Sequence, residues 1–153
     1  PIVAGFCFLF TAAVLLTTRW ALARDPDKEP SVASSVAMGF AQIIALLPGV
    51  SRSGMTVTAA LWSGLDPKKA AQFSFMMLLP AVSGASILSI PDLAEGGLGV
   101  GMAPLLAGFA SAAIVGVLAI KVFIVMLKNR SFPLVAGYLA LLGIGFIFWL
   151  QNA

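Results

Sequence analysis

Residues 31–65 read SVASSVAMGFAQIIALLPGVSRSGMTVTAALWSGL, and this stretch decides how the chain is built. It consists of two apolar arms, 31–47 and 56–65, joined by a short polar turn. As helices the arms would extend about 24 Å and about 15 Å, whereas the hydrocarbon core of a bilayer is about 30 Å thick. We therefore predict a re-entrant helical hairpin that returns to the side it entered from, with two full crossings as the alternative.

The overall composition is that of an integral membrane protein. The chain has 153 residues, of which 60% are hydrophobic and 10% are charged, and its mean hydropathy is +1.04. Soluble domains carry about 25% charged residues, so this composition excludes an ordinary soluble domain. A single cysteine excludes a disulfide framework, and the absence of histidine excludes histidine catalysis and histidine metal sites. We expect residues 1–153 to form one integral membrane domain, an all-α polytopic helical bundle. We expect no interaction with nucleic acid.

Apolar stretches long enough to cross a bilayer flank the hairpin on both sides. They are residues 2–22 before it and residues 70–90, 102–127 and 132–150 after it. Asp66 and Pro67 are expected to begin the helix that follows the hairpin, as its N-cap and first residue. Small residues at Gly108, Ala112 and Gly116 would allow another helix to approach closely.

The charged residues support the hairpin. With residues 31–65 returning to their own side, one side of the membrane collects all the basic residues of the loops between spans and of the span ends beside them. These are Arg19, Arg24, Lys28, Lys68, Lys69, Lys128 and Arg130. The opposite side has a loop with Asp92 and Glu95 and no basic residue. The positive-inside rule then makes the basic side cytoplasmic and places the C-terminus on the outer side. A single crossing by 31–65 would put basic loops on both sides.

Arg52 stands at the tip of the hairpin, far from either membrane surface. A charge at that depth costs several kcal/mol unless it is paired or hydrated, so it indicates a functional site. All six acidic residues lie in loops outside the spans, so the partner must be a missing part of the protein or an anionic ligand. Lys121, by contrast, can extend its side chain toward the basic side, and we assign it no function.

The residues around Arg52 suit a phosphate group. Gly49 and Gly54 let the backbone bend, and the free amides near Ser53 and Gly54 face the break at the start of the second arm. Arg52 offers a fork of donors that matches phosphate oxygens. Hydroxyl groups come from Ser51, Ser53 and Thr56. The simpler alternatives are that the serines only cap the second arm and that the Thr56 hydroxyl bonds within its own helix.

The run Pro-Gly-x-Ser-Arg-Ser-Gly-x-Thr at residues 48–56 resembles the second signature motif of the undecaprenyl-diphosphate phosphatase family, also called the bacitracin-resistance family. The likeness continues through Leu65, Ala70-Ala71 and Phe73-Ser74-Phe75 to Leu79-Pro80. It implies a protein of two inverted repeats whose re-entrant hairpins meet near the membrane centre. Since the chain begins at Pro1 and runs directly into an apolar helix, we expect it to be the C-terminal portion, with the second repeat and one preceding span.

The resemblance also implies an activity. Members are hydrolases of the bacterial plasma (inner) membrane that dephosphorylate undecaprenyl diphosphate, which recycles the lipid carrier for peptidoglycan synthesis. We accordingly predict Arg52 and Ser51 as catalytic residues. The predicted substrate-binding residues are Gly49, Ser53, Gly54 and Thr56. The family uses a divalent cation, Mg²⁺ or Ca²⁺, and we expect no metal ligand in this chain.

This chain departs from the family pattern in one respect. The other family motif, an acidic Glu-x-x-x-Glu run followed by a Ser and His element, is absent. We therefore expect the chain to hold half a site and to be inactive without the missing N-terminal repeat. Its other expected partners are a polyprenyl diphosphate and membrane lipids, and a homodimer is left open. The alternatives are a transporter or flippase for an anionic lipid, and an assembly subunit in which Arg52 pairs with a carboxylate of another chain.

Overall fold

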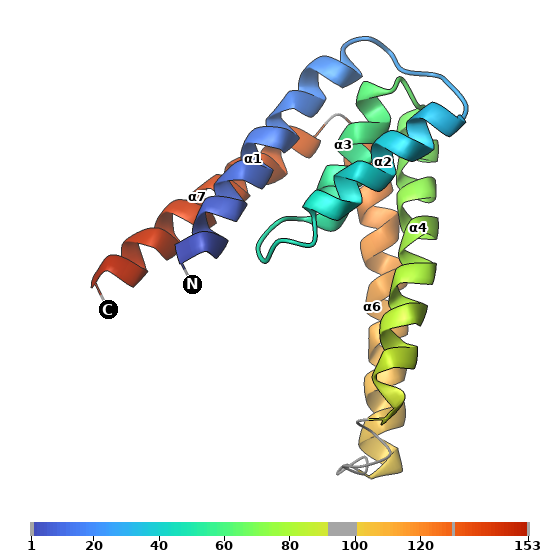
Figure 1. Cartoon of the computed structure of the whole chain (residues 1–153), viewed down its shortest axis with the longest axis vertical. Helices are drawn as coiled ribbons and strands as arrows, with labels where there is room; N and C mark the ends of the chain where they lie inside the picture. Colours follow the sequence, from blue (N-terminus) through green and yellow to red (C-terminus); the bar gives the residue numbers. More distant parts are fainter. Residues whose placement is uncertain (1, 92–100, 130, 153) are drawn as a thin grey trace.

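The computed structural model describes residues 2–91, 101–129 and 131–152. The described residues form six helices (Figure 1): α1 (Ile2–Leu22), α2 (Val32–Ile44), α3 (Arg52–Trp62), α4 (Pro67–Leu88), α6 (Met102–Lys128) and α7 (Phe132–Asn152). Four of them, α1, α4, α6 and α7, are long and apolar enough to cross a membrane. The predicted all-α polytopic fold is confirmed. Asp92, Glu95 and Arg130, for which the sequence predicts a side of the membrane, lie outside the described residues.

The helices α2 and α3 form a closed hairpin. They have 13 and 11 residues, so each is shorter than the four long helices. The amide of Lys28 donates to the carbonyl of Gly64 at 2.9 Å, and the amide of Asp66 donates to the carbonyl of Lys28 at 3.2 Å. These bonds hold the segment before α2 beside the segment after α3, so the chain enters and leaves the hairpin at the same end (Figure 1).

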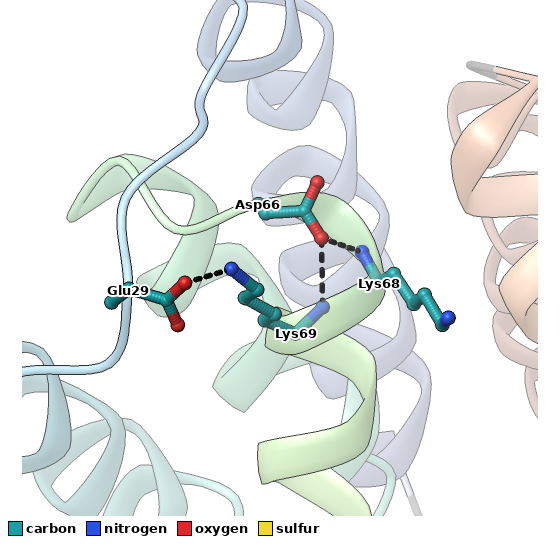
Figure 2. A network of polar contacts seen from close by, with 4 residues as sticks. All are labelled: Glu29, Asp66, Lys68 and Lys69. Atoms are coloured by element: carbon teal, nitrogen blue, oxygen red, sulfur yellow. Dashed lines mark hydrogen bonds and ion pairs between the residues drawn. The ribbon is translucent and has the colours of Figure 1, made fainter.

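The start of α4 is fixed by the residues that the sequence indicated. The carboxylate of Asp66 accepts hydrogen bonds from the amides of Lys68 at 3.0 Å and Lys69 at 3.1 Å (Figure 2). Pro67 occupies the first helical position, where its missing amide proton is not needed. The ammonium of Lys69 also pairs with Glu29 in the loop before α2, which adds a side-chain contact to the closed end of the hairpin.

The long helices are arranged in two diverging pairs, with the hairpin between them (Figure 1). In the pair α1 and α7, a Cβ atom added to Gly5 would lie 2.5 Å from Ile147, and one added to Gly143 would lie 3.0 Å from Leu9. In α6, by contrast, nothing lies within 4 Å of a Cβ atom added to Gly108. The close approach expected along α6 is therefore not formed among the described residues, because the face of α6 carrying Gly108 has no helix against it.

A buried apolar core joins the pairs where they meet the hairpin. It includes Leu15 of α1, Met38 of α2, Leu61 of α3, Leu127 at the end of α6 and Ala136 of α7. Phe123 of α6 packs edge-on against Phe75 of α4 and Phe132 of α7, with ring centroids 5.4 Å and 5.2 Å apart. The core therefore fixes the hairpin relative to all the long helices.

The basic helix ends gather at the closed end of the hairpin. A hollow of about 330 Å³ is lined by residues that include Asp25, Asp66, Lys68 and Lys128. The end of α1, the start of α4 and the end of α6 thus lie together, at the upper end of Figure 1. The described acidic side chains also belong to this end, away from the hairpin tip.

Candidate functional site

The tip of the hairpin is pressed against α1 at a glycine. Gly49 has a φ of +95°, a conformation that strongly favours glycine. A Cβ atom at this position would lie 2.8 Å from the carbonyl oxygen of Ala4 and 3.0 Å from the Cβ of Cys7. Both the backbone conformation and the space therefore require glycine, and the result is a tip held close to the first turns of α1.

Ser51 begins the second arm as a helix cap. Its Oγ accepts a hydrogen bond from the amide of Gly54 at 3.2 Å, while its own amide donates to the Thr11 hydroxyl of α1 at 3.3 Å. The capping alternative for Ser51 is therefore observed, and the Gly54 amide that we expected to face a ligand is already engaged. The amides of Arg52 and Ser53, in the first turn of α3, have no acceptor among the described residues.

Arg52 is half-buried, and its side chain lies between two hollows along α4. The first, of about 410 Å³, is lined by Ala45, Val50, Arg52, Ser53, Ser74, Phe75 and Leu78. The second, of about 380 Å³, is lined by Arg52, by residues of α4 from Ala81 to Ser86, and by the C-cap Ser89. We call the first hollow the Arg52 cavity.

The guanidinium of Arg52 has no carboxylate partner within the described part of the chain. The nearest acidic residue along the hairpin, Asp66, follows the far end of α3, and α3 is about 16 Å long. A cation that shares an apolar-walled cavity with hydroxyl groups, and that lacks a counter-charge, is suited to bind an anion. The fork of donors on an arginine matches the oxygens of a phosphate group.

Thr56 is buried directly behind the Arg52 cavity. Only 1% of its surface is exposed, and its hydroxyl donates to the carbonyl of Arg52 at 2.9 Å. The alternative of a bond within its own helix is therefore observed. The same hydroxyl also lies 2.6 Å from the hydroxyl of Ser74 on α4. Thr56 thus reaches the cavity through Ser74 rather than by exposing its own oxygen.

Ser74 lines the site although no feature of the sequence indicated it as a site residue. In the sequence it belongs only to the Phe73-Ser74-Phe75 likeness, whereas the structure places it in the wall of the Arg52 cavity. Of the predicted site residues, the structure places Arg52 and Ser53 in the lining of this cavity. The other four are not among its lining residues: Gly49, Ser51, Gly54 and Thr56. The catalytic and binding roles of these residues stay predictions.

The described residues do not fit a divalent cation. Throughout the described ranges, no group of three or more Cys, Asp and Glu residues lies close enough to hold a metal, and the chain has no histidine. The Arg52 cavity offers hydroxyl groups and a positive charge, which repels a cation. A metal ion at this site would need carboxylates from outside these residues.

Comparisons with known proteins support the family resemblance that the motif indicates. The family described as "Bacitracin resistance protein BacA" matches residues 1–145. The chain is similar to the undecaprenyl-diphosphatase of Methanosphaera stadtmanae, with 38% identity over 141 residues, which cover 92% of this chain and 50% of that relative. It is also similar to the undecaprenyl-diphosphatase of Methanothermobacter thermautotrophicus, with 38% identity over 144 residues, which cover 92% of this chain and 79% of that relative.

A third relative, the undecaprenyl-diphosphatase of Geobacter sulfurreducens, is 47% identical over 95 residues, which cover 61% of this chain and 35% of that relative. The chain thus spans about half the length of most of the curated relatives it matches. No solved structure shows significant similarity to it.

Proposed function

The chain belongs to the bacitracin resistance protein BacA family, and on this basis we propose that it forms part of an enzyme that hydrolyses undecaprenyl diphosphate to undecaprenyl phosphate. The relatives named above are undecaprenyl-diphosphatases. The observation that carries the proposal is the guanidinium of Arg52, which lines a cavity with Ser53 and Ser74 and has no acidic partner in the described chain. Because the chain spans about half of most relatives, we assign it the diphosphate-binding half of the site.

In this proposal, Arg52 supplies the main charge at the site. Its guanidinium binds two oxygens of the diphosphate and stabilises the negative charge that develops as the bridging P–O bond breaks. The free amides at the start of α3 donate to the same anion. Ser51 keeps its cap, because its oxygen accepts from Gly54 while its proton stays available to donate to the ligand.

The remaining parts of the reaction come from outside this chain. We propose that a missing repeat provides the carboxylates that hold a divalent cation, Mg²⁺ or Ca²⁺, together with the acid–base group. The prenyl tail lies in the lipid between helices. We place the protein in the plasma (inner) membrane, with the basic end cytoplasmic and the C-terminus on the outer side. A homodimer is an alternative source of a second hairpin.

The names of the relatives do not favour a transporter or flippase. That alternative predicts movement of an anionic lipid without its hydrolysis. The assembly-subunit alternative predicts a carboxylate of another chain at Arg52, so that exchanging the two charges would restore stability and no anion would protect the protein. Unlike the proposal, both alternatives predict that no phosphate is released when undecaprenyl diphosphate is added.

The test measures phosphate release from undecaprenyl diphosphate in detergent with Mg²⁺ or Ca²⁺, using the protein expressed from its complete reading frame. Arg52→Ala is compared with the parent, and Lys121→Ala is the matched control because Lys121 is a cation on an exposed face of α6. We expect an active parent, an active control and an Arg52→Ala variant that is folded and almost inactive. Parental turnover in Arg52→Ala would contradict the assignment.

A further inference from the structure

We propose that Ser74 of α4 binds a phosphate oxygen of the anion held by Arg52, and that Thr56 orients the Ser74 hydroxyl for this contact. The identity of the anion as a diphosphate rests on the function proposed above. The assignment of Ser74 itself rests on the cavity and on the hydroxyl pair. Ser74 would thus be a substrate-binding residue, and Thr56 a positioning residue that acts through it.

Ser74 is placed to make this contact by its position in the cavity wall. It lines the Arg52 cavity together with Arg52 and Ser53, although only 6% of its surface is exposed. Its hydroxyl lies 2.6 Å from that of Thr56, which is a short hydrogen bond between two buried groups. A hydroxyl held this firmly presents its remaining hydrogen-bonding capacity in a fixed direction.

The single proton of each hydroxyl determines what Ser74 can do. When Thr56 donates to the carbonyl of Arg52, Ser74 must donate its own proton to Thr56, so that Ser74 faces the cavity only as an acceptor. When Thr56 turns its proton to Ser74 instead, the Ser74 proton is free to donate into the cavity. A phosphate oxygen accepts hydrogen bonds, so an anion beside Arg52 favours the second arrangement.

Removing either hydroxyl has a different structural consequence, which makes the proposal testable. In Ser74→Ala, Thr56 still donates to the carbonyl of Arg52, so no buried donor loses its only acceptor. In Thr56→Val, the buried Ser74 hydroxyl loses its hydrogen-bond partner. Thr56→Ser keeps the hydroxyl. Thr58→Val is the matched control, because the Thr58 hydroxyl is also buried, and among the described residues its one hydrogen bond is to the carbonyl of Gly54, at 2.6 Å.

The first experiment measures KM and kcat for undecaprenyl diphosphate with the protein from its complete reading frame. Losing a hydrogen bond to a charged ligand weakens binding about tenfold or more. We therefore expect Ser74→Ala and Thr56→Val to raise KM about tenfold with little change in kcat, which is the pattern of a lost binding contact. Thr58→Val should keep the parental KM, and Thr56→Ser, which keeps the hydroxyl, should raise KM less than Thr56→Val. A KM within twofold of the parent for Ser74→Ala would overturn the proposal.

A second experiment separates this inference from the proposed function. It measures how far inorganic pyrophosphate raises the thermal unfolding midpoint of the parent, Ser74→Ala and Thr58→Val. We expect the pyrophosphate-dependent increase to fall in Ser74→Ala and to persist in Thr58→Val. An inactive parent with a Ser74-dependent increase would refute the phosphatase and retain the anion contact. An active parent whose KM and pyrophosphate response ignore Ser74 would refute only the role of Ser74.

Discussion

Lys28 and Leu65 lie side by side in a parallel bridge, although the whole α2–α3 hairpin separates them in the sequence. The two hydrogen bonds that make this bridge both use main-chain atoms of Lys28. These bonds join the two ends of the hairpin beside the basic residues. Arg52 stands at the opposite end, at the tip where the turn joins α2 to α3. The length of α3 therefore separates Arg52 from the bonds that join the two ends of the hairpin.

Gly64, beside this bridge, should tolerate asparagine better than alanine. Its φ is +88°, and a left-handed conformation costs an ordinary residue about 1–2 kcal/mol, whereas asparagine adopts it more readily. An added Cβ would meet only the Lys28 side chain, at 3.1 Å, and that side chain can move. We expect Gly64→Ala to lower the free energy of unfolding by about 1–2 kcal/mol and Gly64→Asn by less, as measured by SDS titration. Equal losses would contradict this explanation.

Gly49, at the tip of the hairpin, should tolerate neither alanine nor asparagine. Any side chain there meets the main chain of α1 at Ala4, which cannot move as a side chain can. We expect Gly49→Ala and Gly49→Asn to loosen the tip from α1 and expose Cys7, the single cysteine of the chain, which is buried. The rate of maleimide labelling should rise in both variants. Gly39→Ala, in open space on α2, is the control and should label at the parental rate.

Arg52→Lys should inactivate the enzyme even though it keeps the positive charge. Lysine cannot form the two-pronged contact that arginine makes with phosphate oxygens. We expect kcat/KM for undecaprenyl diphosphate to fall on the order of 10²-fold, the loss typical of removing one transition-state donor. Arg24→Lys is the control, since Arg24 stacks on Trp62 4.9 Å away and lies outside the cavity. Similar kinetics for the two variants would argue against a fork-like contact.

Asp66→Ala should weaken the start of α4. The carboxylate accepts from two amides of the first turn, and loss of an N-cap costs about 0.5–2 kcal/mol. We expect a lower free energy of unfolding and faster hydrogen exchange at Lys68 and Lys69, with Asp66→Ser retaining most of the stability. Glu29→Gln, which removes only the exposed ion pair with Lys69, should leave the exchange at these amides unchanged. Unchanged exchange in Asp66→Ala would show that the cap is dispensable.

Features determined by neighbouring residues were predictable from the sequence. The Asp66-Pro67 pair indicated the start of α4, and the structure begins α4 at Pro67. The break at Gly49 and the cap at Ser51 follow from glycine and serine chemistry in a short turn. Local propensities and the lengths of apolar stretches therefore sufficed for the all-α fold and for the two short helices.

Features that depend on packing between distant helices were not predictable. Thr56 and Ser74 meet only because α3 and α4 lie together, and no spacing in the sequence indicates which hydroxyl groups will face each other. The contact of Gly5 with Ile147 joins the two ends of the chain in the same way. The sequence indicated a close approach at Gly108, whereas the structure shows one at Gly5, because close approach depends on which helices become neighbours.

The location of the Arg52 cavity has a consequence for how the protein is synthesised. All its lining residues lie between Ala45 and Leu78, whereas α7, which packs on α1, follows them in the chain after α6. Proteins emerge from the ribosome beginning with their N-terminal part. The residues of the anion cavity are therefore synthesised before α6 and α7, and α7 packs on α1 only after the residues around Arg52 are available to assemble.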